Sequence, residues 1–327
     1  MRMTSRRELL LSGLAAFPFT PALADTRIRL LFGGDVIFSR GVATKMEKTG
    51  ENPLQMLAER FRAADLSFVN LESPFSDQPL IWQAEMVFRA DPSAVKHLLD
   101  AGIDVVSTAN NHVRDCGPRG IEFTLEHLRK NNIVPIGTGR DEAEAYAGTV
   151  VERRGVKFGF LAYTFDQSNG NHRDSDPRIA MLDIAKMQTG VAALRRKTGL
   201  GPVIVSMHAG VEYQAKPHPS QVEFARAAID AGAKLVVGHH PHVVQTFEMY
   251  RGGLILYSLG NLVFDQRRPD AQRGLLAEAM FTPEGHLTEC SLVSVDIVDT
   301  APRVSKRGGE STILIGAMAG SAGGVGR

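Results

Sequence analysis

The sequence is poor in cysteine, has almost no net charge and contains no long hydrophobic run. Its two cysteines, Cys116 and Cys290, lack the Cys-x-x-Cys spacing, which argues against a zinc finger or a cysteine-based redox site. With 37 basic and 36 acidic residues, the formal net charge of +1 gives no global attraction for nucleic acid or an anionic membrane. No apolar segment reaches the length of a transmembrane helix, so we expect no membrane span in the mature chain. Whether the two cysteines pair is left open.

The N-terminus has the composition of an export signal. Adjacent arginines, Arg6 and Arg7, precede an apolar stretch at 9–17, and small residues at 22–24 offer a cleavage site. We therefore predict a twin-arginine-type signal peptide over 1–24, with the twin-arginine export machinery as a partner and a periplasmic or otherwise exported protein. A cytoplasmic helix or a membrane anchor is the alternative, but the apolar stretch is short and is followed closely by prolines.

Hydrophobic periodicity predicts strands that alternate with helices. The predicted strands are 28–33, 66–69, 105–108, 134–136, 149–151, 157–163, 203–207, 235–237, 254–257, 275–281 and 287–295, and the predicted helices are 53–64, 92–101, 118–130, 184–197 and 219–231. This order favours an α/β fold in which helices cover a sheet. The polar run 166–178 predicts a loop. We expect one domain over 27–299, followed by a poorly ordered tail over 300–327 that is rich in small and basic residues.

The polar motifs share one position, because each follows a predicted strand. They contribute Asp35, Glu72, Asn111, His112, His208, His240 and His242. In layered α/β folds ligands bind beyond the carboxyl ends of strands, so these residues are expected to meet at one edge. Each motif alone is equally compatible with a turn, a loop or a helix cap.

The donor set indicates a metal centre. Carboxylate, amide and imidazole donors suit zinc, manganese or iron better than calcium, and their number exceeds one tetrahedral site. We expect a divalent metal cofactor, most simply two ions that share a bridging carboxylate. Such a pair activates water and stabilises a developing oxyanion, which predicts hydrolysis.

The histidine cluster is the densest of these motifs. It reads Val-Val-Gly-His-His-Pro-His over Val236–His242. Because a strand sends residues i and i+2 to the same side, we expect His240 and His242 to converge on one point, with Pro241 fixing the local turn. The alternative is a group of hydrogen-bonded loop histidines.

The succession of motifs resembles the CapA family, which is named for poly-γ-glutamate capsule biosynthesis and belongs to the calcineurin-like metallophosphatase superfamily. The matching segments, in unbroken order over 27–264, are Gly34-Asp35-Val36, Asn70-Leu71-Glu72-Ser73, Ala109-Asn110-Asn111-His112 with Asp115 and Gly117, His208-Ala209-Gly210 with Glu212-Tyr213, Gly238-His239-His240-Pro241-His242 and Tyr257-Ser258-Leu259-Gly260-Asn261. The resemblance implies a four-layer fold, with two central mixed β-sheets flanked by helices and a di-metal site at one edge.

The resemblance also implies a role for each site residue. Asp35 would bind the first metal, Glu72 would bridge, Asn111 and His208 would bind the second metal, and His240 and His242 would be divided between them. His112 would act as an acid near the metals and Asp115 would orient it. We assign substrate binding to Asn110, Glu212 and Asn261, with Lys216 and the pair Arg267-Arg268 as further candidates for binding anionic groups.

The sequence departs from the phosphatase pattern of the superfamily in three places. The usual Asp-x-His is Asp35-Val36-Ile37, the second strand supplies Glu72 in place of an aspartate, and the doubled histidine leaves His239 and His240 as alternative ligands. We choose His240. These changes match the CapA branch and argue against ordinary phosphomonoesterase activity. A site that lacks one imidazole is also compatible with a single tightly bound metal.

We therefore predict an exported, metal-dependent hydrolase of amide or phosphoester bonds. Its expected partner is an anionic cell-envelope polymer, such as poly-γ-glutamate, or a precursor of one. Two alternatives remain, a non-catalytic factor for polymer binding or export and a metal-dependent phosphodiesterase.

Overall fold

The computed structural model describes residues 26–79, 86–165 and 176–315. The predicted signal peptide, most of the predicted loop at 166–178 and the last part of the predicted tail lie outside these residues. Within them, no helix combines the length and the apolar character needed to cross a membrane. Cys116 and Cys290 are buried free thiols.

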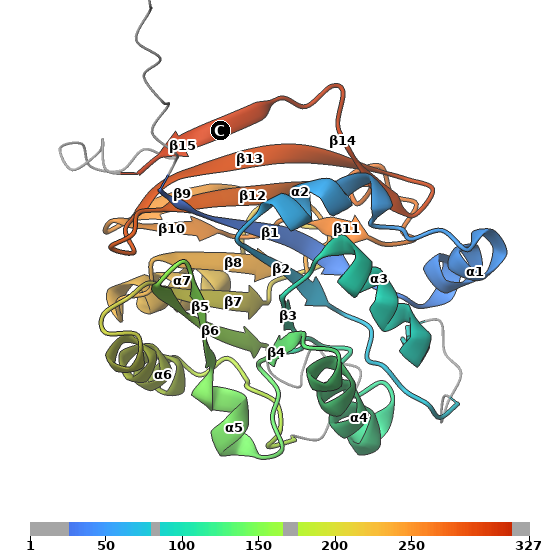
Figure 1. The fold of residues 1–327 in the computed structure, drawn as a ribbon, viewed down its shortest axis with the longest axis horizontal. Coiled ribbons are helices and arrows are strands. Elements are labelled where there is room, and N and C mark those ends of the chain that lie inside the picture. Colours follow the sequence, from blue (N-terminus) through green and yellow to red (C-terminus); the bar gives the residue numbers. More distant parts are fainter. Residues whose placement is uncertain (1–25, 80–85, 166–175, 316–327) are drawn as a thin grey trace, which may run out of the picture.

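Two mixed β-sheets form the centre of the described protein (Figure 1). The larger sheet has the order β14-β13-β12-β1-β2-β3-β4, with β11 paired to β1 and β15 paired to β13. Its strands are β1 (Ile28–Val36), β2 (Leu66–Leu71), β3 (Val105–Ser107), β4 (Val134–Ile136), β11 (Asn261–Val263), β12 (Arg273–Phe281), β13 (Leu287–Val298), β14 (Ala301–Val304) and β15 (Glu310–Leu314).

The smaller sheet has the order β5-β6-β7-β8-β10-β9. Its strands are β5 (Thr149–Arg153), β6 (Val156–Thr164), β7 (Val203–His208), β8 (Leu235–His239), β9 (Phe247–Tyr250) and β10 (Gly253–Leu256). In the larger sheet the parallel strands β1 to β4 extend to one edge, and the antiparallel strands β12, β13 and β14 form the other side. In the smaller sheet the parallel strands β6, β7, β8 and β10 lie between the antiparallel edge strands β5 and β9.

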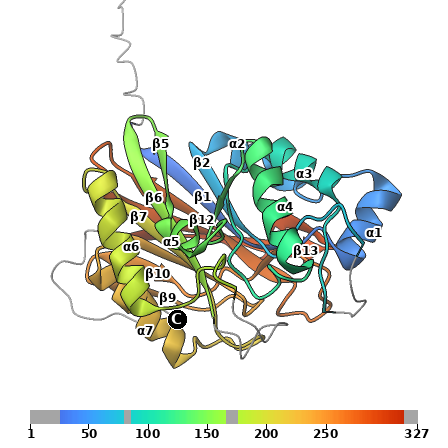
Figure 2. The same cartoon turned by 90° about the horizontal axis from the view of Figure 1, so that it is seen from below.

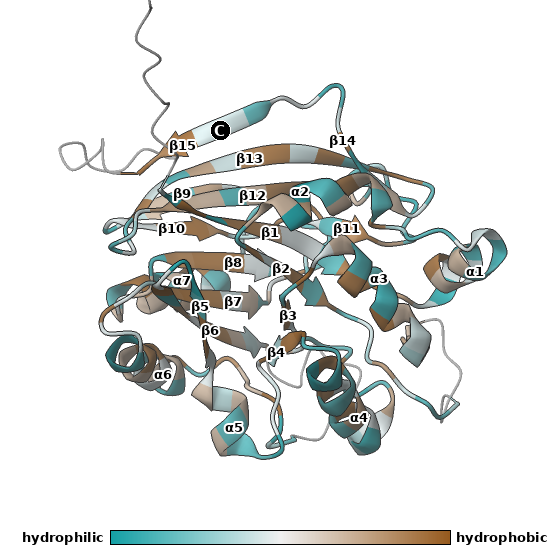
Figure 3. Ribbon diagram, in the orientation of Figure 1, coloured by the Kyte–Doolittle hydropathy of each residue, from teal (hydrophilic) through white to brown (hydrophobic). Residues whose placement is uncertain are grey.

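Helices cover the outer face of each sheet, which makes four layers (Figure 2). The helices are α1 (Arg40–Thr49), α2 (Ala58–Ala63), α3 (Val95–Ala101), α4 (Gly117–Lys130), α5 (Glu142–Ala147), α6 (Ile184–Lys197) and α7 (Pro219–Asp230). Residues of α2 and α3 pack on the larger sheet, and residues of α6 and α7 pack on the smaller one. Figure 3 shows the contrast between hydrophobic strands such as β8 and β10 and the hydrophilic residues of α4 and α6.

Aromatic side chains fill the layer between the sheets. Phe32 and Phe68 of the larger sheet have ring centroids 5.6 Å apart, and Phe68 stacks across the layer on Phe160 of the smaller sheet at 6.5 Å. Neighbouring residues of β1 point to opposite faces, so Leu31 packs under the helices while Phe32 enters this central layer. Strands buried on both faces explain why their sequences are almost continuously apolar.

The predicted α/β fold with two central mixed sheets is confirmed, and one boundary was wrong. The segment after Thr300, predicted to be a disordered tail, contributes β14 and β15, which both pair antiparallel with β13. These strands could not be predicted from the polar sequence of the segment. The strand β15 is largely exposed and depends on backbone pairing rather than on burial of apolar side chains. The helices α1 and α5 and the short strands β9 and β11 were also not predicted.

A close backbone contact between β8 and β10 explains one glycine of the histidine motif. A Cβ atom added to Gly238 would lie 1.9 Å from the carbonyl oxygen of Tyr257. We expect Gly238→Ala to lower the free energy of unfolding of the metal-free protein by about 1–3 kcal/mol, because the strands must move apart. Urea denaturation measures this change. Gly309→Ala is the matched control, since nothing lies within 4 Å of its added Cβ atom. Equal stability of the two variants would contradict the expectation.

Candidate metal centre

The ends of five strands bring the predicted site residues together. The parallel strands β1, β2 and β3 of one sheet and β7 and β8 of the other all run toward the same side (Figure 1). Asp35 lies near the end of β1, Glu72 follows β2, and His208 ends β7. As predicted, residues far apart in the sequence therefore meet at one edge.

Asp35 lies at the centre of this group and is fully buried. Its Oδ1 accepts a hydrogen bond from Asn70 Nδ2 at 2.9 Å and lies 3.3 Å from His239 Nδ1. Its Oδ2 accepts a hydrogen bond from the backbone N–H of His240 at 3.3 Å and lies 3.4 Å from His242 Nδ1. Asp35 thus contacts both sheets through one carboxylate.

Glu72 provides the second buried carboxylate. Its Oε1 lies 3.6 Å from His242 Nε2, and 3.8 Å from both His112 Nε2 and His208 Nε2. Within the described residues, neither carboxylate oxygen makes a hydrogen bond. Three imidazole nitrogens therefore surround one carboxylate, as expected for a ligand shared between two metal ions.

The histidine motif reaches the site through a bend rather than through a strand. The strand β8 ends at His239, so the predicted strand geometry of His240 and His242 is wrong. Both residues instead have left-handed backbone angles, with φ of 95° and 58°. Such angles are uncommon for residues with a side chain and cluster at functional sites. The bend still places the two rings close together, with centroids 6.0 Å apart.

The titratable groups form two sets that could each hold a metal ion. Asp35, Glu72 and His208 make one set, and Glu212, His240 and His242 make the other; the ligand atoms in each lie within 4.8 Å of one another. His239 belongs to neither set among the described residues, and its ring faces Asp35 and Phe68. The grouping of ligand atoms favours His240 over His239, although both ring nitrogens of His239 are also buried without a hydrogen bond in the described residues. Glu212, predicted to bind substrate, is half-buried beside two histidines and fits a ligand equally well.

His112 and Asp115 form the contact that their spacing predicts. His112 Nδ1 lies 2.7 Å from Asp115 Oδ2, which also accepts a hydrogen bond from the backbone N–H of Phe88 at 2.6 Å. The ring of Phe88 stacks on the imidazole with centroids 3.8 Å apart. The carboxylate and the stacked ring together fix the imidazole, with its Nε2 directed toward Glu72.

Asn111 and His208 also converge as predicted. His208 Nε2 lies 2.8 Å from Asn111 Oδ1, so both candidate ligand atoms face the same point. The other ring nitrogen, Nδ1, lies 3.2 Å from Asn70 Nδ2. Asn70 was not among the predicted site residues, although it stands two positions before Glu72. It joins Asp35 to His208 and thereby joins the two sheets.

Asn110 and Asn261, predicted to bind substrate, both make hydrogen bonds within the protein. Asn110 is buried, donates to the carbonyl oxygen of Leu71 at 2.8 Å and accepts from the backbone N–H of His112 at 3.1 Å. Asn261 Oδ1 lies 2.9 Å from His242 Nδ1, and its Nδ2 donates to Gln266 Oε1 at 2.8 Å. Both amides are committed to protein partners, which favours a positioning role.

Burial and mutual contact shift the pKa values of the site. Burial would raise the pKa of Asp35, but its contacts with His239 and His242 outweigh burial and hold the pKa well below its usual range. Burial raises the pKa of Glu72 well above its usual value, and the charge of Asp35 adds to this effect. An ionised Glu72 therefore needs a nearby positive charge.

The pKa values of the imidazoles are also shifted in opposite directions, lowered for His208 and His240 and raised for His242. Burial together with the charge of His242 lowers the pKa of His240 to about 3, and burial together with His240 lowers the pKa of His208 well below its usual value. Burial also acts to lower the pKa of His242, but the carboxylates of Glu72 and Asp35 raise it to about 9. His208 and His240 are thus neutral, the state in which an imidazole binds metal.

These observations fit a divalent metal centre. Both oxygens of Glu72 and Nδ1 of His240 are buried without a hydrogen bond in the described part of the chain, and such groups are costly unless a cation satisfies them. The mixture of carboxylate and imidazole donors suits zinc, manganese or iron.

Metal content tests the role of Glu72. Protein equilibrated with Mn²⁺ or Zn²⁺ is expected to bind metal, and Glu72→Gln is expected to lose most of it because a neutral amide replaces the charged carboxylate. Elemental analysis after gel filtration measures the bound ions. His286→Asn, at an exposed position, should bind as much metal as the unaltered protein. Equal metal content in Glu72→Gln would rule out this centre.

Metal affinity tests the role of Asn261. We expect Asn261→Ala to weaken metal binding about 10–100-fold, because the hydrogen bond that orients His242 is lost. Isothermal titration calorimetry gives the affinity, and Asn131→Ala at the end of α4 is the control. Unchanged metal affinity with weakened polymer binding would instead support the predicted substrate role.

Comparison with known proteins agrees with the geometry. The family described as bacterial capsule synthesis protein PGA_cap matches residues 29–266. The PGA biosynthesis protein CapA of Bacillus subtilis is 32% identical over 260 residues, which are 78% of this chain and 68% of that protein. The capsule biosynthesis protein CapA of Bacillus anthracis is 30% identical over 250 residues, 74% of this chain and 61% of that protein.

Among solved structures, the NAD nucleotidase NadN of Haemophilus influenzae has a similar fold. The TM-score is 0.52 at 12% sequence identity, and the match covers 88% of this chain and 54% of that one. The chain thus spans about half the length of NadN, and the likeness establishes the metallophosphatase-like fold alone. The family match over 29–266, in contrast, includes every candidate ligand, and this chain belongs to the PGA_cap (CapA) family.

Proposed function

We propose that this protein is an exported, metal-dependent hydrolase that acts in the synthesis or processing of an anionic envelope polymer. One observation carries the proposal, namely that the buried Glu72 carboxylate has no hydrogen bond within the described residues and lies within 3.8 Å of three imidazoles. A purely structural carboxylate at this depth would be hydrogen-bonded. Export is supported by the arginine pair and apolar stretch of the first 24 residues.

The chain supplies the ligands for such a centre. Asp35, Glu72 and His208 would hold one ion and His240 and His242 the other, with Asn111 beside His208 and Glu72 between the two groups. Divalent metals at such a site supply activation of water and polarisation of a carbonyl or phosphoryl oxygen. Asn70 and Asn261 keep the ligands in place through their hydrogen bonds to Asp35 and His242.

His112 is placed to move a proton at its Nε2 atom. Because Asp115 engages Nδ1, the proton on that nitrogen is held and Nε2 is the nitrogen that faces Glu72 and the centre. The stacked ring of Phe88 excludes water from one face of the imidazole. A group with this orientation can protonate a leaving amine or alcohol as the bond breaks.

The substrate class rests on the names of relatives. Two Bacillus relatives are named for PGA or capsule biosynthesis, and a relative from Mycobacterium tuberculosis, 28% identical over 286 residues, is named a probable polyglutamine synthesis accessory protein. Polyglutamine is uncharged, so the anionic polymer of glutamate, or its precursor, follows from the PGA and capsule names, and it is the first substrate to test.

Turnover of a γ-glutamyl oligomer tests the role of His112. We expect His112→Asn to lower kcat about 10²–10⁴-fold while the metal content stays unchanged, because only proton transfer is lost. Asp115→Asn should give a smaller loss, since Nε2 remains in place. Chromatography of the cleaved oligomer gives the rates, and elemental analysis gives the metal content.

Two outcomes separate the alternatives. A metal-loaded protein that binds the oligomer but never cleaves it would replace the hydrolase with a polymer-binding or export factor. Cleavage of a chromogenic phosphodiester in place of the γ-glutamyl oligomer would identify a phosphodiesterase.

A further inference from the structure

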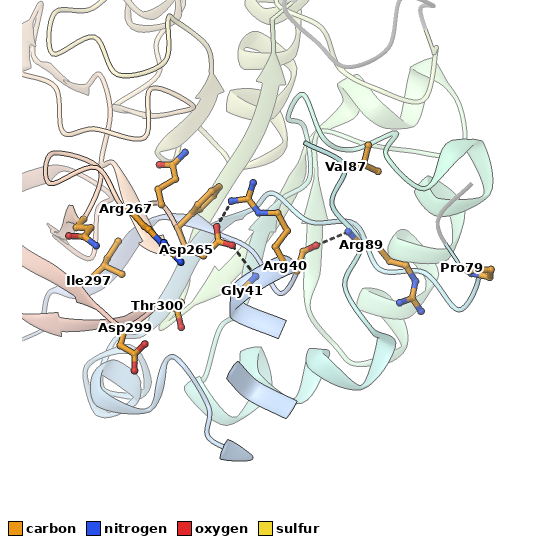
Figure 4. Close-up of a pocket in the computed structure, with 14 residues that line it drawn as sticks. Arg40, Gly41, Pro79, Val87, Arg89, Asp265, Arg267, Ile297, Asp299 and Thr300 are labelled. Carbon is orange, nitrogen blue, oxygen red and sulfur yellow. Dashed lines mark hydrogen bonds and ion pairs between the residues drawn. The ribbon is translucent and has the colours of Figure 1, made fainter. Parts of the chain in front are cut away.

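A large cleft adjoins the metal centre and has no role so far. Its volume is about 1400 Å³, above the range of about 300–1,000 Å³ that holds most small molecules. It is lined by Ser39, Arg40, Gly41, Pro79, Val87, Arg89, Phe264, Asp265, Gln266, Arg267, Gln272, Ile297, Asp299 and Thr300 (Figure 4). These residues come from the start of α1, the segment before α3, the loop after β11 and the turn between β13 and β14.

Two lining residues connect the cleft to the centre. The ring of Phe264 packs against the imidazole of His242 with centroids 4.7 Å apart. Gln266 accepts a hydrogen bond from Asn261, the residue that contacts His242 Nδ1. Residues that line the cleft therefore also hold His242, a candidate metal ligand, in position.

Arg40 lies at this border. Its guanidinium carbon is 4.7 Å from the ring centre of Phe88 and 5.7 Å from that of Phe264. Each ring also contacts an imidazole of the site, Phe88 that of His112 and Phe264 that of His242. Asp265 forms an ion pair with Arg40 and accepts a hydrogen bond from the backbone N–H of Gly41 at 2.9 Å, as Figure 4 shows. The guanidinium is thus held in a fixed orientation, with about a quarter of the side chain exposed.

The cleft carries an excess of positive charge. Of its two acidic residues, Asp265 pairs with Arg40 and Asp299 pairs with Lys45. Arg89 donates from Nε to the carbonyl oxygen of Gln78, and its terminal nitrogen is 4.0 Å from a largely exposed Asp91, a weak pair. Arg267 is exposed and forms no ion pair among the described residues. Guanidinium groups bind carboxylates through two parallel hydrogen bonds, so several arginines suit a ligand with several carboxylates.

We propose that this cleft binds successive carboxylates of an acidic polymer, and that Arg40 holds the carboxylate nearest the metal centre. Arg89 and Arg267 bind carboxylates farther along the chain. The inference rests on the proposed function, which places the reacting bond of the substrate at the metal centre. It adds that the cleft is the surface by which the protein selects a polymer over a small ester. Arg40 is accordingly a specificity-determining residue, since it reaches the substrate beside the reacting bond.

Binding of a fluorescein-labelled γ-linked glutamate oligomer to the metal-loaded full chain tests this proposal. We expect Arg40→Gln, Arg89→Gln and Arg267→Gln each to weaken binding about 10-fold in fluorescence anisotropy and to reduce its salt dependence, because each removes one charged contact. Arg251→Gln is the matched control. That arginine is exposed like Arg267 and ion-paired like Arg40, but it lies at the turn between β9 and β10.

Further variants keep the result interpretable if one protein is unstable. Arg40→Lys retains the charge and loses the two-pronged contact, so it should bind with intermediate affinity. Urea denaturation confirms that each variant is folded. Unchanged affinity in both Arg89→Gln and Arg267→Gln, or an equal loss in Arg251→Gln, would overturn the proposal. Tighter binding of polyphosphate than of the glutamate oligomer, lost in the same variants, would overturn the choice of a carboxylate polymer.

Failure of this inference differs from failure of the proposed function. If the protein cleaves the oligomer and the arginine variants bind it normally, the cleft proposal is wrong and the hydrolase stands. If the oligomer binds through the arginines and is never cleaved, the hydrolase is wrong and the cleft proposal stands.

Discussion

The structure depends on two carboxylates that are buried where two sheets meet. Asp35 and Glu72 are both fully buried, and an ionised group at such depth costs several kcal/mol unless opposite charge surrounds it. Asp35 is stabilised by the amide of Asn70, the backbone N–H of His240 and the imidazoles of His239 and His242. For Glu72 it places imidazoles nearby without completing a hydrogen bond in the described structure. The fold therefore stabilises one carboxylate itself and leaves the other without a hydrogen bond in the described residues, as a candidate metal ligand.

This arrangement is supported by amides more than by further charges. Asn70 connects Asp35 with His208, Asn110 holds the turn that carries His112, and Asn261 orients His242. Each amide offers a donor and an acceptor at fixed geometry, so one residue can orient two neighbours without adding charge to a crowded centre. The hydrogen bond from Gln266 Nε2 to the Tyr213 hydroxyl extends the network to the loop after β7. Such outer contacts fix the direction in which a ligand presents its donor atom.

Local pattern and strand polarity were enough to predict the position of the centre. Asp35, Glu72 and His208 could be placed at one edge because apolar strands end in polar residues and parallel strands end together. The backbone at His240 and His242 could not be predicted, since left-handed angles at a histidine depend on tertiary contacts such as the approach of Asp35. The positioning roles of the asparagines were not predicted for a related reason. The sequence shows that Asn261 is polar, but it does not show which groups form hydrogen bonds with its amide. The strands β14 and β15 were missed because their exposed side chains give no apolar alternation.

The position of Arg40 links the chemistry of the centre to the cleft. Burial raises the pKa of Glu72, and the positive charge of Arg40 is one of the influences that act to lower it. The same guanidinium therefore favours the ionised, metal-binding state of Glu72 and attracts an anionic substrate from the cleft. Phe88 and Phe264 each contact Arg40 as well as an imidazole of the site, His112 for Phe88 and His242 for Phe264. Because about a quarter of its side chain is exposed at the cleft while its charge acts on Glu72, one arginine can influence both the ligand and the substrate.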